Sequence, residues 1–133
     1  MPENVKPSAA PLVCIVDDDA SIAESTRYLV RSFGFSAEAF LSAQEYLSSS
    51  LVEQTSCLIL DVRMPGMDGF ELQRYLATAN KPIPIVFVTA HANDSERRQA
   101  MAGGAVDFLP KPFSEDALIA ALQAALNRIA EEP

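Results

Sequence analysis

Short apolar runs alternate along this chain with segments of helical length, and this alternation constrains the fold more than any other feature. The runs occupy residues 12–16, 57–60, 83–88 and 105–109, with a weaker one at 35–40. Between and after them we expect helices at residues 21–33, 42–49, 68–79, 94–103 and 114–131. Apolar strands separated by helices are typical of a parallel sheet covered on both faces, because each right-handed crossover returns the chain in the same direction. The pattern predicts a doubly wound α/β domain with five βα units.

Residues that favour helix ends support these boundaries. The spacing of Ser21 and Glu24 fits a capping box, and Ser114 precedes two acidic residues of a first turn. We also expect N-caps at Asp68 and Asp94, and helix stops at Gly34, Asn80 and Gly103.

Length and charge limit the function. The chain has 133 residues, enough for one domain, and a formal net charge of −8, which argues against direct nucleic-acid binding. None of the apolar runs is long enough to span a bilayer, and the N-terminus lacks an apolar signal core, so we expect a cytoplasmic protein with no membrane contact. Residues 1–10 read as a flexible tail, and residues 11–131 as the folded domain.

Polar residues follow four of the five predicted strands. Asp17, Asp18 and Asp19 follow the first, Asp61 the third, Thr89 the fourth and Lys111 the fifth. In doubly wound sheets, functional residues gather at the carboxyl ends of the strands. Consecutive carboxylates repel one another unless a hard cation lies among their oxygens, and Mg²⁺ is the expected cofactor. On its own, the acidic run could equally be a solvated turn or a helix N-cap.

Together these residue types suit phosphoryl transfer to a carboxylate. Asp61 could attack phosphorus, while Asp18 and Asp61 hold the metal ion. Thr89 could donate a hydrogen bond to one phosphoryl oxygen, and Lys111 could form an ion pair with another.

Four segments resemble the receiver domains of two-component signalling: LVCIVDDDAS, LILDVRMPGMDG, FVTAH and GAVDFLPKPF. The likeness extends over residues 12–131, with the motifs in the right order and at the right separations. It implies a flavodoxin-like, five-stranded parallel sheet with strand order 2-1-3-4-5.

The resemblance also assigns roles to individual positions. It makes Asp17 and Asp18 the acidic pair, Asp61 the phosphoacceptor and the backbone carbonyl of Arg63 a metal ligand. It makes Thr89 and Phe108 the switch residues and Lys111 the phosphate-contacting lysine.

Further details concern the surroundings of that site. The peptide bond between Lys111 and Pro112 is expected to be cis, a form that proline tolerates at a cost of about 0.5–1 kcal/mol. Ala90, His91 and Met64 are expected at the pocket edge.

The same resemblance implies partners. A sensor histidine kinase, or a small phosphodonor such as acetyl phosphate, would supply the phosphoryl group. The surface of residues 94–103, 105–109 and 114–131 would relay the change to a second copy or to an output domain. The sequences of residues 61–69 and 104–113 are most similar to those of receivers that precede helix-turn-helix domains. We therefore expect residues 132–133 to be the C-terminal end, with an output domain absent.

Two other functions are weighed against this one. The spacing Asp17-x-Asp19 matches the nucleophile and acid of haloacid-dehalogenase phosphatases, but that hypothesis leaves Asp61 unexplained. A degenerate receiver that only binds proteins is the second alternative. We expect a phosphoacceptor domain rather than an enzyme.

Overall fold

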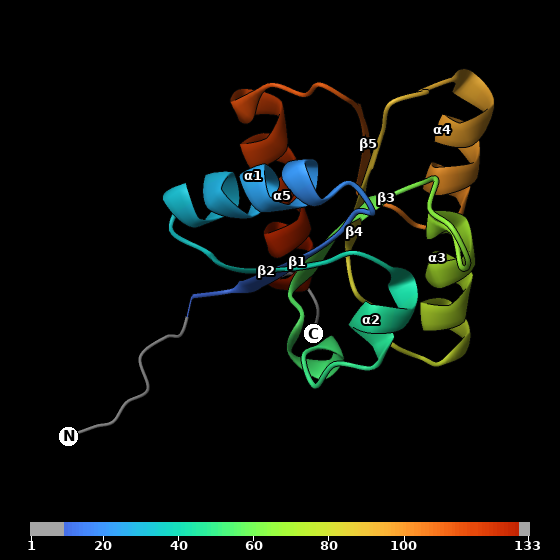
Figure 1. The fold of residues 1–133 in the computed structure, drawn as a ribbon, viewed down its shortest axis with the longest axis horizontal. Helices are drawn as coiled ribbons and strands as arrows, with labels where there is room; N and C mark the ends of the chain where they lie inside the picture. The colour runs from blue at the N-terminus through green and yellow to red at the C-terminus, as the bar shows by residue number, and fades with distance from the viewer. Residues whose placement is uncertain (1–9, 131–133) are drawn as a thin grey trace.

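The computed structural model describes residues 10–130, which form one five-stranded parallel sheet in the order β2-β1-β3-β4-β5 (Figure 1). The strands are β1 (Leu12–Val16), β2 (Ser36–Phe40), β3 (Cys57–Asp61), β4 (Ile85–Thr89) and β5 (Asp107–Pro110). The helices are α1 (Ala20–Ser32), α2 (Ala43–Leu47), α3 (Gly69–Thr78), α4 (Asp94–Ala102) and α5 (Glu115–Ala130), with a short 3₁₀ turn, η1, at Val52–Gln54. The predicted doubly wound fold and its strand order are confirmed.

The helices lie in two layers, with α1 and α5 on one face of the sheet and α2, α3 and α4 on the other (Figure 1). Side chains of a strand alternate between faces, so each strand serves two cores. In β1, Val13 and Ile15 pack with α1 and α5, whereas Cys14 and Val16 pack with the other layer. Burial on both faces explains why these strands read as unbroken apolar runs.

Two strand boundaries differ from the prediction. The run at 83–88 includes Pro84, which has no N–H to donate to the ladder, and β4 begins only at Ile85. The run at 105–109 begins in a turn, where the Ala105 N–H donates to the Ala100 carbonyl over 3.1 Å and ends α4. β5 therefore starts at Asp107.

Two predicted helix N-caps are wrong. Asp19, not Ser21, caps α1 by accepting a hydrogen bond from the Ile22 N–H at 3.1 Å. Asn93, not Asp94, caps α4, because the Asn93 side-chain oxygen accepts a hydrogen bond from the Glu96 N–H at 2.8 Å and the helix then begins at Asp94. At the other end of α4 the predicted stop is confirmed: Gly103 is the C-cap, and the next residue, Gly104, has the left-handed conformation with φ 98°.

Asp68 caps α3 as predicted, in a capping box with Glu71. On α5, Leu118, Leu122 and Ala125 are buried at a helical spacing. Most of the predicted tail, residues 1–9, lies outside the described residues, as do residues 131–133. Within the described part, none of the helices has the length and apolar character that crossing a bilayer requires.

Candidate functional site

A pocket of about 290 Å³ opens at the carboxyl ends of the central strands. It forms where β1 and β3 lie side by side and the chain leaves them in opposite directions around the sheet. Its lining residues are Asp17, Asp18, Asp19, Ile22, Asp61, Arg63, Thr89, Ala90, His91 and Lys111. The sequence predicted that residues after different strands would meet here, and they do.

Three carboxylates converge in this pocket. Asp17 and Asp18 directly follow β1, and Asp61 is the last residue of the neighbouring strand β3. One carboxylate oxygen from each lies within 4.8 Å of the other two. Asp17 and Asp61 are buried, at 1% and 6% exposure, while Asp18 is exposed. The site therefore concentrates negative charge where little water can screen it.

The Lys111 ammonium lies between the two buried carboxylates. Its Nζ is 2.8 Å from Asp17 Oδ2 and 3.4 Å from Asp61 Oδ2. The Lys111 N–H donates to the Thr89 carbonyl over 2.8 Å, and the peptide bond to Pro112 is cis. The turn after β5 is thus fastened to the end of β4, and the lysine side chain extends into the pocket.

The electrostatics of Asp61 follow from this crowding. Burial and the nearby charge of Asp17 raise the pKa of Asp61 to about 6, against the smaller opposing effect of Lys111. Burial alone would lower the pKa of Lys111, but its hydrogen bond to Asp17 and the charges of both carboxylates outweigh that effect and raise it. One cation does not balance three carboxylates, so the pocket favours a further positive charge.

A magnesium ion fits this donor set. The three carboxylates supply hard oxygen ligands within one small space, and the pocket is open enough to admit waters. The neighbouring backbone at Arg63 already approaches the site, with its N–H 3.4 Å from Asp61 Oδ1. The described residues therefore form a cluster that could hold a divalent cation.

The two predicted switch residues lie on neighbouring strands. Thr89, the last residue of β4, is buried, and its Oγ1 accepts a hydrogen bond from the His91 N–H at 3.2 Å. Phe108 on β5 is 1% exposed, so its ring lies inside the domain. The Arg97 guanidinium from α4 lies 5.3 Å from the centre of that ring and donates to the Phe108 carbonyl over 3.0 Å.

Ala90 and His91 line the pocket, but Met64 does not, and its predicted position at the pocket edge is wrong. Met64 is 8% exposed and belongs to the core under α3. In this segment Val62 and Met64 turn inward and Arg63 turns outward, which leaves the arginine at the pocket.

Sequence reasoning missed two residues at or near the site, Ile22 and Glu96. Ile22 lines the pocket, and its N–H donates to the Asp19 side chain, an N-cap signal that could have been recognised. Glu96 lies on α4, and its Oε2 is 2.6 Å from the guanidinium of Arg63. The two residues are 33 positions apart, and no local pattern connects them.

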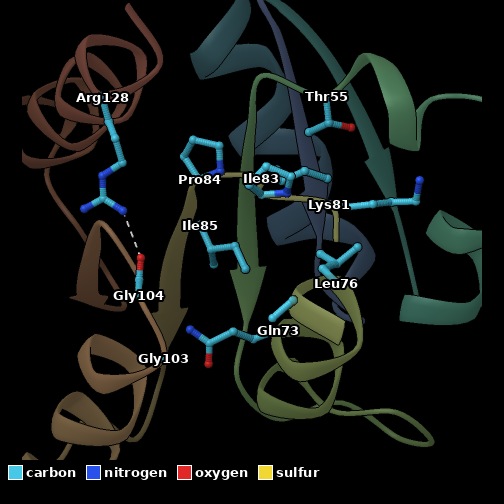
Figure 2. Close-up of a pocket in the computed structure, with 12 residues that line it drawn as sticks. Thr55, Gln73, Leu76, Lys81, Ile83, Pro84, Ile85, Gly103, Gly104 and Arg128 are labelled. Atoms are coloured by element: carbon cyan, nitrogen blue, oxygen red, sulfur yellow. Dashed lines mark hydrogen bonds between the residues drawn. The ribbon is translucent and has the colours of Figure 1, made fainter. Parts of the chain in front are cut away.

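A larger cavity, of about 510 Å³, lies at the opposite end of the sheet (Figure 2). Its walls include Leu76, Ile83, Pro84 and Ile85, with the Gly103–Gly104 turn and Arg128 at one side. The Arg128 guanidinium donates to the Gly104 carbonyl over 2.9 Å. None of the predicted site residues lines this cavity.

Comparison with known proteins identifies relatives of the whole domain. The family model described as the response regulator receiver domain matches residues 13–123. Nodulation protein W of Bradyrhizobium diazoefficiens is 46% identical over 121 residues, covering 91% of this chain and 53% of that protein. Response regulator protein TodT of Pseudomonas putida is 44% identical over 118 residues, covering 89% of this chain and 52% of that protein. The chain thus spans about half the length of these curated relatives.

Solved structures agree with the sequence relatives. The structure of response regulator StyR matches with a TM-score of 0.84 and 49% identity, covering 92% of this chain and 62% of that one. The structure titled FixJ-N matches with a TM-score of 0.79 and 33% identity, covering 88% of this chain and 94% of that one. The fold, the order of the motifs and these relatives lead to one conclusion: the chain belongs to the family of response regulator receiver domains.

Proposed function

We propose that this receiver domain is switched by phosphorylation of Asp61 in a reaction that requires Mg²⁺. The observation that supports this most directly is the convergence of three carboxylates and one lysine amine from separate strand ends in one pocket. In this proposal Asp17, Asp18, Asp61 and the Arg63 backbone carbonyl hold the metal ion. A sensor histidine kinase or a small phosphodonor such as acetyl phosphate supplies the phosphoryl group.

In the reaction, a carboxylate oxygen of Asp61 attacks phosphorus and forms a P–O bond. The bond between phosphorus and the donor breaks, and its electron pair leaves with the donor group. The Lys111 ammonium, already 3.4 Å from Asp61, is placed to pair with an outer phosphoryl oxygen. When bound, Mg²⁺ would neutralise charge on the phosphoryl oxygens.

The response would begin at Thr89. Its hydroxyl, now accepting from the His91 N–H, would donate to a phosphoryl oxygen. Movement of Thr89 would bias the packing of Phe108 and the surface of α4, β5 and α5. The domain would shift between existing conformations by as much as the phosphoryl contacts differ between them.

Partners beyond the kinase belong to this proposal too. A second copy or an output domain would bind the surface of α4, β5 and α5, where Ile119 and Leu126 are only half-buried. The relatives extend well beyond the matched region, which supports an output domain as a partner. A cytoplasmic location stays a prediction.

The comparisons do not favour a phosphatase of the haloacid-dehalogenase type. The Asp19 carboxylate that this hypothesis requires as an acid caps α1 instead. A receiver that binds partners without phosphorylation stays an alternative, and labelling distinguishes the two.

The test is incubation with acetyl phosphate and Mg²⁺, followed by intact-mass measurement and mapping of the modified residue. The wild-type chain should gain one base-labile phosphoryl group, at Asp61. Asp61→Asn should gain none, because the amide is not a nucleophile, whereas Glu53→Gln, far from the pocket, should label normally. Full labelling of Asp61→Asn would refute Asp61 as the acceptor, and absence of labelling in the wild type would favour the binding-module alternative.

A further inference from the structure

An ion pair connects the loop after Asp61 to the first turn of α4. The Arg63 guanidinium, two residues beyond the proposed phosphoacceptor, lies 2.6 Å from Glu96 Oε2. Arg63 also lines the pocket. One side chain therefore belongs both to the site and to a contact with the helix of the output surface.

The two partners of this pair differ in their surroundings. The Arg63 side chain is 55% exposed and can move through solvent, whereas the Glu96 side chain is only 16% exposed. Glu96 Oε1 is buried and has no hydrogen-bond partner among residues 10–130. Arg63 is thus the cation that compensates a largely buried carboxylate, and its departure would leave that charge unpaired in a poorly solvated place.

The next residue of α4 contacts the proposed switch. Arg97 donates to the Phe108 carbonyl and lies over the Phe108 ring. The first turn of α4 is therefore held at two adjacent positions, by the phosphoacceptor loop through Glu96 and by β5 through Arg97. Glu96 is therefore next in sequence to the residue that contacts Phe108.

We propose that Arg63 and Glu96 form a charge-exchange contact, in which a phosphoryl group on Asp61 competes with Glu96 for the Arg63 guanidinium. Before phosphorylation, Glu96 holds the guanidinium toward α4. A phosphoryl dianion offers more charge and more acceptor oxygens than one carboxylate, so it draws Arg63 into the pocket. Glu96 then loses its cation, and the first turn of α4 loosens.

In this role Glu96 is a positioning residue that acts through Arg63, and the inference rests on the proposed function of Asp61. It predicts that removing the charge of Glu96 increases the affinity of the site for a phosphoryl mimic. A purely structural role predicts the opposite, because losing a tertiary contact would weaken or leave unchanged the affinity of the site.

The experiment measures the affinity for beryllofluoride in the presence of Mg²⁺ by calorimetry. Glu96→Gln should bind about two- to fivefold more tightly than wild type, the range expected for one partly exposed ion pair. In an Arg63→Gln background the same substitution should have no effect, because the competing cation is gone. The matched control is Glu53→Gln, which removes another ion pair between elements, with Lys81, at the far end of the sheet. Its affinity should equal that of wild type.

Amide hydrogen exchange across residues 94–97 gives a second readout. In wild type, beryllofluoride should speed exchange there. In Glu96→Gln, exchange should be fast already and change little. Unchanged or weaker beryllofluoride affinity in folded Glu96→Gln, or an equal gain in the Arg63→Gln background, would overturn the charge exchange alone. Absence of binding in wild type would overturn the proposed function as well.

Discussion

Each end of the sheet has a cavity, and the clearest difference between the two cavities is the charge of the groups that line them. At the amino ends of β3 and β4 the larger cavity has mainly apolar walls, and the Arg128 guanidinium on its rim already donates to a backbone carbonyl (Figure 2). At the carboxyl ends, the smaller pocket contains a cluster of three carboxylates, with one ammonium between two of them. Uncompensated charge, which costs stability in the free protein, therefore marks the chemical site better than volume does.

The largest expected effect is on the carboxyl-end pocket. Removing divalent cations with a chelator should abolish labelling by acetyl phosphate, because three carboxylates would repel an incoming phosphoryl group. Phosphoryl incorporation followed by mass measurement checks this, with restoration by added Mg²⁺ as the control. Undiminished labelling in the chelator would contradict the metal site.

Lys111→Met should slow phosphoryl labelling in the same pocket. The methionine keeps much of the side-chain volume but removes the ammonium that lies 3.4 Å from Asp61 Oδ2. Losing one preorganised charge contact to a phosphoryl oxygen should slow labelling by at least about tenfold. A time course of labelling measures this, and a rate equal to wild type would show that the amine does not assist transfer.

A pair of glycine substitutions compares the stability of the two ends. An alanine Cβ at Gly69, beside the pocket, would lie 2.3 Å from the Asp61 carbonyl oxygen, which is fixed in β3. At Gly103, beside the large cavity, the Cβ would lie 2.7 Å from the end of the Gln73 side chain, which can shift into the cavity at the cost of its hydrogen bond to the Ala100 carbonyl. Gly69→Ala should reduce the free energy of unfolding by about 3 kcal/mol or more, and Gly103→Ala by about 1 kcal/mol. Urea titration would contradict this if the order were reversed.

Asp61→Asn should stabilise the metal-free fold, and the gain should depend on pH. The pKa of Asp61 is raised from 3.8 to about 6 in the folded state, so the folded protein holds this proton more tightly than the unfolded chain. The stability that comes from this group is complete below about pH 4 and is lost as the pH rises through about 6. The asparagine variant, which does not ionise, should exceed wild type by about 1–2 kcal/mol at pH 7. Urea titrations at pH 5 and pH 7 would contradict this if the gain were larger at pH 5.

The smallest effect is expected for Arg128→Ala at the large cavity. Its guanidinium makes an exposed hydrogen bond to Gly104, worth about 0.5–1.5 kcal/mol at most. Labelling and Mg²⁺ affinity should stay at wild-type values. A tenfold loss of labelling in a folded protein would show that the two ends are coupled.

Much of this molecule could be predicted from its sequence, because the relevant signals are local or repeat along the chain. Apolar strand runs gave the fold class, and residues directly after the strands gave the pocket. The wrongly predicted element boundaries have local causes. β4 begins after Pro84 and not at residue 83, and the N-cap of α4 is Asn93 and not Asp94. The Arg63–Glu96 contact could not be predicted, since it joins the loop after β3 to the first turn of α4 and depends on how α4 packs. The predicted position of Met64 at the pocket edge was wrong because neighbouring residues of this loop point in opposite directions, and Met64 points into the core.

Calorimetric titration of Mg²⁺ tests the central claim most directly, since that claim is that carboxylates from two strand ends share one cation. Wild type and Glu53→Gln should each bind one Mg²⁺ ion per chain, whereas Asp18→Asn and Asp61→Asn should each lose most of the affinity for Mg²⁺. Unchanged affinity in both of the latter variants would contradict the account.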